Sequence, residues 1–246
     1  MKIRLDTLLV DRGFAETIPK ARALIGSGVV VGPHAILDKA GMQVKDDIAI
    51  NIKGNHCPFV SRGGFKLAEG LSHFNLQIDG LTCADIGAST GGFTDCLLQN
   101  GARRVYAVDV GYGQLDWSLR QNDKVVVLER TNARHLSRAE IPEPIDLAVI
   151  DAAFISIKRL IPPLIPLFAT DKVRILSLIK PQFEVAKGDI GAGGVVRDPA
   201  LHEAVIQSTI DFITDLGLSH SGVTASPILG PKGNREFLID IISASA

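Results

Sequence analysis

The sequence contains little cysteine, no long apolar run and almost no net charge. Its three cysteines have neither an even count nor metal-ligand spacing, which argues against a disulfide-rich secreted domain and against a zinc site. The longest strongly apolar stretch, residues 160–170, has 11 residues and three prolines, whereas a membrane-spanning helix needs roughly 20 residues. The first residues carry charges where a signal peptide would be apolar. We therefore expect a soluble, cytoplasmic protein that requires no metal.

The net charge of −1 excludes a strong overall positive field that would attract nucleic acid. The charges are nevertheless unevenly distributed. Residues 1–66 hold 10 Lys and Arg against 6 Asp and Glu, whereas residues 67–246 hold 16 against 21. This basic front segment indicates that contact with a polyanion begins near the N-terminus. With 46% hydrophobic residues, the chain can form one large domain with a small one, and a core that holds a cofactor.

Residues 1–57 predict a small α+β domain. The expected elements are two helices, beginning at Leu5 and near Pro19, and two short strands, at residues 29–31 and 48–52. Residues 58–63 form a linker to a helix near residues 65–74.

Residues 64–246 show the pattern of a parallel sheet covered by helices on both faces. Continuous apolar runs of strand length alternate with helical segments, which is typical of such sheets. The runs are residues 81–86, 104–108, 125–128, 145–150 and 173–179, and the helices are expected around residues 92–99, 114–121, 156–168 and 201–216. Two final runs, 222–227 and 236–242, are joined by glycine-rich residues 230–234, which predicts a hairpin and an antiparallel last strand.

A glycine-rich turn, residues 85–93 (DIGASTGGF), follows the first strand of this sheet. Such a turn lets a ligand approach the backbone at the carboxyl end of the strand. Asp109 ends the next strand, where a carboxylate suits the two ribose hydroxyls of a nucleoside cofactor. Ser89 stands where a dinucleotide-binding motif has its second glycine, so a cofactor without phosphates is favoured, and S-adenosylmethionine fits. The alternative is a tight turn that any doubly wound fold contains.

Asp151 and Lys180 follow neighbouring strands of the predicted sheet. The carboxyl ends of such strands are where sites form in open α/β sheets. A lysine there is costly to bury without a partner, and Asp151 is one candidate partner. Lys66, at the start of a helix, and Glu236, at the start of the last strand, are equally compatible with exposed surface positions. Spacing alone does not connect these four residues.

The whole chain resembles the TlyA group, historically called hemolysins, which is similar to FtsJ-type ribosomal RNA 2'-O-methyltransferases. The segments that carry the resemblance are RLD at 4–6, AR at 21–22, VSRGGFKL at 60–67, DIGASTGGF at 85–93, Asp109, KPQFE at 180–184 and NREF at 234–237. Departures from the group fall at Pro33 and His34, in place of an asparagine-glycine turn, and at Ala40, where proline is common.

The resemblance implies an α/β class I methyltransferase fold, Rossmann-like, with a seven-stranded, mostly parallel sheet. It also implies an N-terminal RNA-binding domain like that of ribosomal protein S-four. The activity it implies is S-adenosylmethionine-dependent methylation of a ribose 2'-hydroxyl, at cytidine, in large-subunit ribosomal RNA, with small-subunit RNA as a further candidate. The partner is ribosomal RNA within ribosomal subunits, and we expect no membrane and no obligate protein partner.

The resemblance also implies site residues. A catalytic tetrad falls on Lys66, Asp151, Lys180 and Glu236. In this hypothesis Lys180 lies beside the ribose hydroxyl and Lys66 orients the ribose. The expected cofactor-binding residues are Asp85, Gly87, Ser89, Gly91, Gly92, Phe93, Asp109 and Asn132. The expected RNA-binding residues are Arg4, Arg12, Lys20, Arg22 and Arg62, with a solvated helical face as the alternative for those in the front domain.

Two further segments near these residues remain open. Tyr112 and Trp117 flank the adenine ring in one interpretation, and core packing is as good an account of Trp117. The glycine-rich residues 188–197 have no strand before them and are interpreted as a mobile lid.

Three other functions compete with RNA methylation. A membrane-active cytolysin has no spanning segment or signal peptide to support it. An RNA-binding module with an inert methyltransferase body disagrees with the intact glycine loop and tetrad. A nucleotide-dependent oxidoreductase disagrees with Ser89 in the glycine loop.

Overall fold

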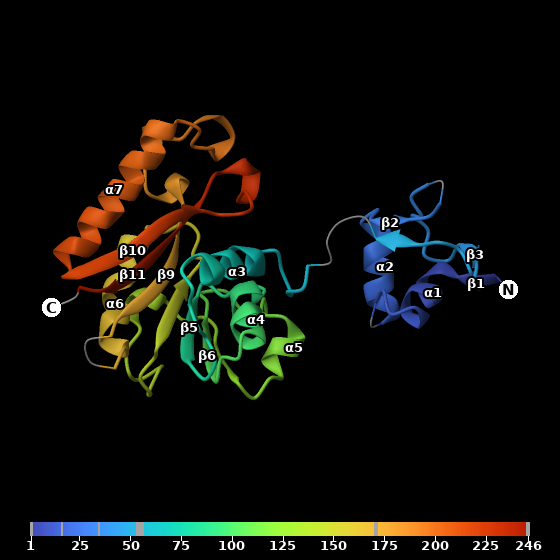
Figure 1. The fold of residues 1–246 in the computed structure, drawn as a ribbon, viewed down its shortest axis with the longest axis horizontal. Coiled ribbons are helices and arrows are strands. Elements are labelled where there is room, and N and C mark those ends of the chain that lie inside the picture. Colours follow the sequence, from blue (N-terminus) through green and yellow to red (C-terminus); the bar gives the residue numbers. More distant parts are fainter. Residues whose placement is uncertain (1, 16, 34, 53–56, 170–171, 245–246) are drawn as a thin grey trace. The chain divides into compact units, whose positions relative to one another are not determined.

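The chain forms two compact units, Met1–Cys57 and Pro58–Ala246, in the computed structural model (Figure 1). The structure describes residues 2–15, 17–33, 35–52, 57–169 and 172–244. Of the sequence departures noted above, His34 lies outside the described residues. No helix in the described part of the chain is long and apolar enough to cross a membrane.

The first unit packs two helices against short antiparallel strand pairs. Its elements are β1 (Lys2–Arg4), α1 (Leu5–Asp11), α2 (Ile18–Gly26), β2 (Val30–Val31), β3 (Gln43–Lys45) and β4 (Asn51–Ile52). Strand β1 pairs with β3, and β2 pairs with β4. The predicted helices are confirmed, whereas β1 and β3 are absent from the sequence prediction. These two strands have three residues each and carry polar or charged, exposed side chains at their ends, so no apolar run marks them.

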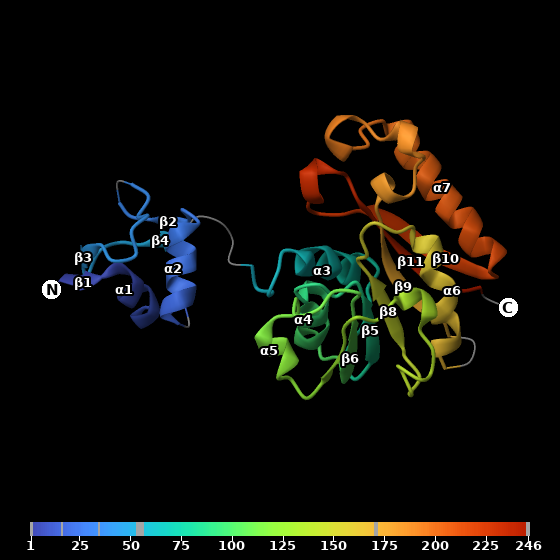
Figure 2. The same cartoon turned by 180° about the vertical axis from the view of Figure 1, so that it is seen from behind.

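The second unit contains one seven-stranded sheet with the strand order β10-β11-β9-β8-β5-β6-β7 (Figures 1 and 2). The strands are β5 (Thr82–Ile86), β6 (Arg104–Val108), β7 (Val125–Leu128), β8 (Leu147–Ile150), β9 (Arg174–Ile179), β10 (Leu218–Ala225) and β11 (Phe237–Ser243). Strand β11 runs antiparallel to both β9 and β10, and the other pairings are parallel. The predicted mostly parallel sheet with an antiparallel last strand is confirmed.

Both faces of this sheet are covered, which explains the continuous apolar runs in the sequence. Alternate residues of each strand enter separate cores: in β8, Ala148 and Ile150 face one core, and Leu147 and Val149 face the other. The first core includes residues of α6 (Ile161–Leu164) and α7 (Pro199–Asp215), and the second includes residues of α3 (Gly63–His73) and α4 (Gly92–Gln99). The carboxyl ends of the parallel strands are thereby left free for a site.

The helix predicted over residues 156–168 is broken into short pieces. These are η2 (Ile157–Arg159), α6 and η3 (Ile165–Leu167). Prolines occupy the first turns of α6 and η3, and proline lacks the N–H group that would continue a preceding helix. The predicted strand 222–227 begins earlier, as β10, and the helix around 114–121 shortens to α5 (Trp117–Arg120).

Candidate active site

Four charged side chains gather at the carboxyl end of the sheet, and they are the four that the sequence resemblance implies. Lys180 Nζ lies 2.5 Å from Asp151 Oδ1. Lys66 Nζ lies 3.7 Å from Asp151 Oδ2 and 2.6 Å from Glu236 Oε2. The structure therefore places the two amines and two carboxylates in one network, in which Asp151 lies within ion-pair distance of both lysines.

The strand register explains how residues distant in sequence meet. Phe237 pairs with Ile179 across the antiparallel strands β11 and β9, so Glu236 and Lys180 leave the sheet side by side. Asp151 directly follows β8, the other neighbour of β9. The register cannot be derived from the spacing of residues along the chain, which is why sequence alone did not connect the four residues.

Helix α3 brings Lys66 to the network because small residues let the helix approach the sheet. A side chain at Gly70 would place its Cβ 2.8 Å from Leu176 Cδ2 of β9. At Gly64, the Cβ would lie 2.2 Å from the Phe59 ring. The helix therefore packs directly on the sheet and buries the Lys66 side chain.

Three of the four side chains are buried, and Asp151, which lines the pocket described below, is partly exposed. Lys66 and Lys180 are each 7% exposed, and Glu236 is 1% exposed. Isolated charges at such positions would be strongly unfavourable, and opposite charges within hydrogen-bond distance offset the desolvation. Glu236 Oε1 has no hydrogen-bond partner among the described residues.

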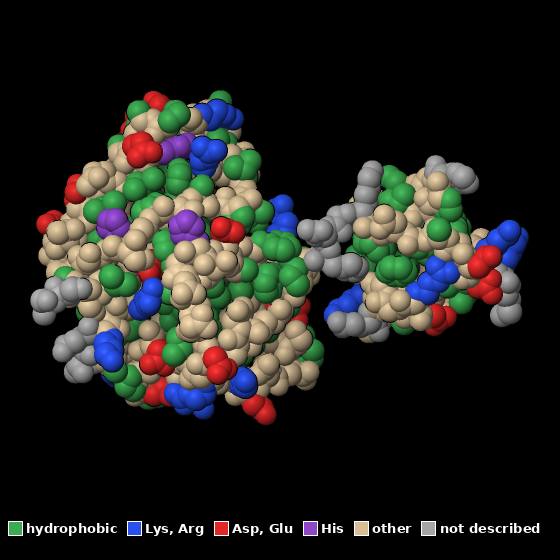
Figure 3. All heavy atoms as spheres, viewed as in Figure 1, with side chains coloured by type: hydrophobic (Ala, Val, Ile, Leu, Met, Phe, Trp, Pro, Cys, Tyr) green, Lys and Arg blue, Asp and Glu red, His purple; other side chains and the backbone are tan. Residues whose placement is uncertain are grey.

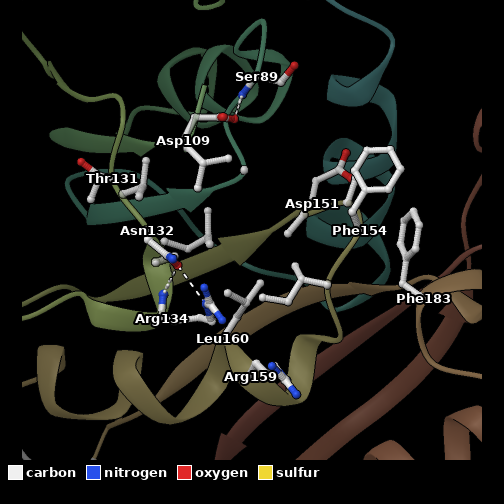
Figure 4. Close-up of a pocket in the computed structure, with 18 of the residues that line it drawn as sticks. Ser89, Asp109, Thr131, Asn132, Arg134, Asp151, Phe154, Arg159, Leu160 and Phe183 are labelled. Atoms are coloured by element: carbon white, nitrogen blue, oxygen red, sulfur yellow. Dashed lines mark hydrogen bonds between the residues drawn. The ribbon is translucent and has the colours of Figure 1, made fainter. Parts of the chain in front are cut away.

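A pocket of about 840 Å³ opens beside Asp151 (Figure 4). Figure 4 shows Ser89 and Asp109 on one side of it and Asp151 with the aromatic residues Phe154 and Phe183 on another. The site thus combines a charged network with an adjoining cavity large enough for a nucleoside-sized ligand.

Asp109 fixes the glycine-rich turn that forms one wall of the pocket. Its Oδ2 accepts a hydrogen bond from Ser89 N at 2.8 Å, and its Oδ1 accepts one from Gly111 N at 2.7 Å. Gly87 has φ +87°, and a Cβ there would lie 2.8 Å from the backbone oxygen of Asp151. Glycine is required at this position by both the backbone conformation and the close approach.

Asp85 lies behind the turn and is fully buried. Its Oδ2 accepts a hydrogen bond from Thr94 Oγ1 at 2.7 Å, and its Oδ1 has no partner among the described residues. Burial raises the pKa of Asp85 to about 7, from an ordinary value of 3.8, because the charged form is poorly solvated there.

The comparisons with known proteins agree with this geometry. Residues 59–241 match the model of the FtsJ-like methyltransferase family. The chain belongs to this family.

Relatives of this FtsJ-like methyltransferase confirm the resemblance to the TlyA group. The chain is 44% identical to the 16S/23S rRNA (cytidine-2'-O)-methyltransferase TlyA of Mycobacterium tuberculosis, over 97% of this chain and 89% of that protein. It is 38% identical to Hemolysin A of Brachyspira hyodysenteriae, over 98% and 100%. A solved candidate hemolysin of Streptococcus thermophilus is 40% identical with a TM-score of 0.77, covering 100% of this chain and 90% of that one.

The structure places only some of the expected cofactor-binding residues at the pocket. Gly87, Ser89, Asp109 and Asn132 line it. The expected residues that are not part of its lining are Asp85, Gly91, Gly92 and Phe93. These four are buried, and Phe93, a residue of α4, packs in the core between this helix and the sheet.

Tyr112 and Trp117 do not line the pocket either. They are 69% and 70% exposed, and the Tyr112 ring lies under the guanidinium of Arg130 at 4.2 Å. The structure therefore supports neither adenine stacking nor core packing for Trp117.

Three of the expected RNA-binding arginines already have partners within the first unit. Arg4 and Arg22 donate hydrogen bonds to the carboxylate of Asp6, which is 1% exposed. These guanidinium groups hold the pKa of Asp6 well below its usual range. Arg12 donates to the backbone oxygens of Asp46 and Ile48. Lys20, on α2, and Arg62, just before α3, are exposed.

Sequence reasoning missed the aromatic side of the pocket. Phe154 is 91% exposed and has φ +63°, an uncommon conformation for a residue with a side chain. Its ring lies 5.3 Å from that of Phe183. Each of these residues follows a member of the charged network by three positions: Phe154 follows Asp151, and Phe183 follows Lys180. That shared spacing was the available signal.

Proposed function

We propose that the chain transfers a methyl group from S-adenosylmethionine to the 2'-hydroxyl of a cytidine ribose in ribosomal RNA. The observation that carries this proposal is the buried Lys66–Asp151–Lys180–Glu236 network beside the pocket that Asp109 and Asp151 line. Family membership and the rRNA (cytidine-2'-O)-methyltransferase among the relatives support the same chemistry.

The pocket residues fit a nucleoside cofactor that lacks phosphate groups. Asp109 directly follows β6, in the position where a carboxylate accepts hydrogen bonds from ribose hydroxyls. Asn132 also lines the pocket and can offer its side-chain amide, whose oxygen already accepts from Arg134 N. S-adenosylmethionine supplies a methyl group that is activated by the positive charge on its sulfur.

The network fits the demands of the acceptor. A ribose hydroxyl is a poor nucleophile at neutral pH, so placing it in line with the methyl carbon supplies much of the rate. Lys180, held by Asp151, puts a positive charge beside the hydroxyl and favours the negative charge that develops on its oxygen. Lys66, held between Asp151 and Glu236, keeps these carboxylates in place and orients the ribose.

The remaining parts of the chain fit an RNA substrate. The exposed Phe154 ring, paired with Phe183 at the edge of the pocket, offers a face on which a base can stack. The basic first unit serves as an RNA-binding domain that positions the methyltransferase unit on ribosomal RNA. We place the protein in the cytoplasm, where ribosomal subunits are assembled.

The test is methylation of defined ribosomal subunits. Subunits lacking the modification are incubated with the chain and cofactor labelled in the methyl group, and the RNA is then cleaved with alkali. We expect one label-bearing linkage that resists cleavage, because methylation blocks the 2'-oxygen. Label on a base, or no transfer to either subunit, contradicts the proposal.

A further inference from the structure

A second pocket, of about 400 Å³, lies between the loop that precedes α7 and the loop that precedes β11. Its charged lining comprises Arg197 from the first loop and Lys232 and Arg235 from the second, and no carboxylate of the described residues lines it. His202, also in the lining, has its Nε2 3.0 Å from the backbone oxygen of Val196. The pocket is therefore cationic.

The three cations are not neutralised by neighbours. Within the described part of the chain, Arg197, Lys232 and Arg235 form no ion pair, and all three side chains are exposed. Of these three side chains, Arg197 donates a hydrogen bond from Nη1 to the backbone oxygen of Ala192, at 3.3 Å. Figure 3 shows Lys and Arg side chains beside a histidine where the loops drawn orange and red in Figure 1 meet.

The loops that carry these cations are locked together by Asn234, which is 3% exposed. Its Oδ1 accepts a hydrogen bond from Val196 N at 3.1 Å, and its Nδ2 donates one to Gly194 O at 3.0 Å. The segment interpreted from sequence as a lid is therefore tied to the loop before β11. The two backbone segments that carry the positive charges are thus held together before any ligand arrives, which favours binding of an anion.

The pocket adjoins the active site through consecutive residues. Glu236 turns inward and pairs with Lys66, whereas Arg235, one residue earlier, is exposed and lines the second pocket. Adjacent Cα atoms lie about 3.8 Å apart, so the backbone that carries the second pocket continues directly into the charged network. A ribose that reaches this network has a phosphate group on each side in the same strand.

We propose that Arg197, Lys232 and Arg235 bind a backbone phosphate of the RNA strand next to the target ribose. This inference rests on the proposed function and assigns a substrate contact to the methyltransferase unit itself. Arginine forks match phosphate oxygens in geometry, and lysine adds a point charge. The contact positions the strand and does not read its sequence.

The test compares the full chain with the triple variant R197Q/K232Q/R235Q and with Lys124→Gln as a matched control. Lys124 is also exposed, but it precedes β7 at the amino end of the parallel strands. Each protein is assayed for methyl transfer to unmodified ribosomal subunits, for binding of the same subunits at several salt concentrations, and for S-adenosylmethionine affinity by calorimetry.

We expect the triple variant to raise KM for subunits by about tenfold or more and to lower the slope of log affinity against log salt by about one phosphate equivalent. Its cofactor affinity and its kcat should stay within about twofold of the unsubstituted chain, as should all properties of Lys124→Gln. Unchanged cofactor affinity also shows that the variant is folded.

Two results would overturn the inference. One is a KM and salt slope equal to those of the Lys124→Gln control. The other is a loss confined to kcat, which would mean that the substitutions disturb Glu236 and remove no RNA contact. If the unsubstituted chain binds subunits and cofactor but transfers no methyl group, the proposed function fails, and the salt slope still decides whether the pocket binds RNA phosphate.

Discussion

At the scale of single residues, the buried Asp85 carboxylate lowers the stability of the fold when it is charged. Burial raises its pKa to about 7, so between about pH 4 and about pH 7 the folded chain keeps a proton that the unfolded chain has lost. As the pH rises through this window, the group lowers the free energy of unfolding by up to about 1.4 kcal/mol per pH unit. Above about pH 7, Asp85 is ionised in both states, and the lowering of the free energy of unfolding is complete and constant.

We therefore predict that Asp85→Asn removes this pH dependence. Asparagine can still accept the hydrogen bond from Thr94 and carries no charge. The variant's free energy of unfolding, measured relative to the unsubstituted chain by urea titration, should increase from about pH 4 to about pH 7 and then level off. The exposed Asp123→Asn serves as control and should give a constant difference. A constant difference for Asp85→Asn would show that the buried carboxylate is solvated.

The four network residues show what sequence can and cannot provide at this scale. Their chemical types were predictable: Lys66, Lys180 and Glu236 stand within segments that carry the resemblance, and Asp151 follows a predicted strand. Their grouping was not derivable from spacing, because it depends on the antiparallel register of β9 and β11. Phe93 shows the converse: it belongs to the glycine-rich signature, yet its side chain packs in the core.

At the scale of elements, the turn between β5 and α4 connects fold stability to the site. Gly87 combines φ +87° with a close approach to the backbone of Asp151. Gly80 also has a positive φ, of +76°, but nothing lies within 4 Å of where its Cβ would be. Substitution at Gly80 therefore tests the cost of the backbone conformation alone, whereas substitution at Gly87 tests that cost together with a steric clash.

We predict that Gly87→Ala is more damaging than Gly80→Ala. Both substitutions carry the conformational cost of a left-handed alanine, about 1 kcal/mol in free energy of unfolding. Gly87→Ala should lose about 1–3 kcal/mol more, because Asp151 or the turn must move. Denaturant unfolding and methyl-transfer rates measure both effects, and methyl transfer should fall for Gly87→Ala alone. Equal losses in the two variants would mean that the turn yields without disturbing Asp151.

The strands of the seven-stranded sheet were predictable because a strand that is buried on both sheet faces has a continuous apolar sequence. Strands β1 and β3 of the first unit were not, because three residues leave too short a pattern. Strands β2 and β4 fall within the runs predicted at residues 29–31 and 48–52. The segment 156–168 is apolar enough to suggest one helix, and its prolines divide it into short turns. In this segment the missing N–H groups of the prolines determined the structure more than the apolar pattern did.

At the scale of the whole molecule, the chain separates charge and chemistry between two units. The pocket and the charged network lie entirely within residues 58–246. Residues 1–57 hold 8 Lys and Arg against 6 Asp and Glu, whereas residues 58–246 hold 18 against 21. This division explains how a protein with a net charge of −1 can act on a polyanion.

We predict that residues 58–246 alone bind S-adenosylmethionine with an affinity within about twofold of the full chain, because the pocket is complete. Their KM for ribosomal subunits should rise by about tenfold or more, since the phosphate contacts of the first unit are lost. Calorimetry and methyl-transfer kinetics measure the two quantities. An unchanged KM would show that the first unit makes no contribution to substrate binding.

The central claim is that the lysine–carboxylate network beside the cofactor pocket drives methyl transfer. Its most direct test measures the transfer rate and the S-adenosylmethionine affinity of Lys180→Ala in the same preparation, with Lys124→Ala as control. We predict that Lys180→Ala loses about 10²–10⁴-fold in transfer rate while its cofactor affinity is retained, and that the control matches the unsubstituted chain. A Lys180→Ala variant that binds the cofactor and methylates RNA at the normal rate would contradict the account.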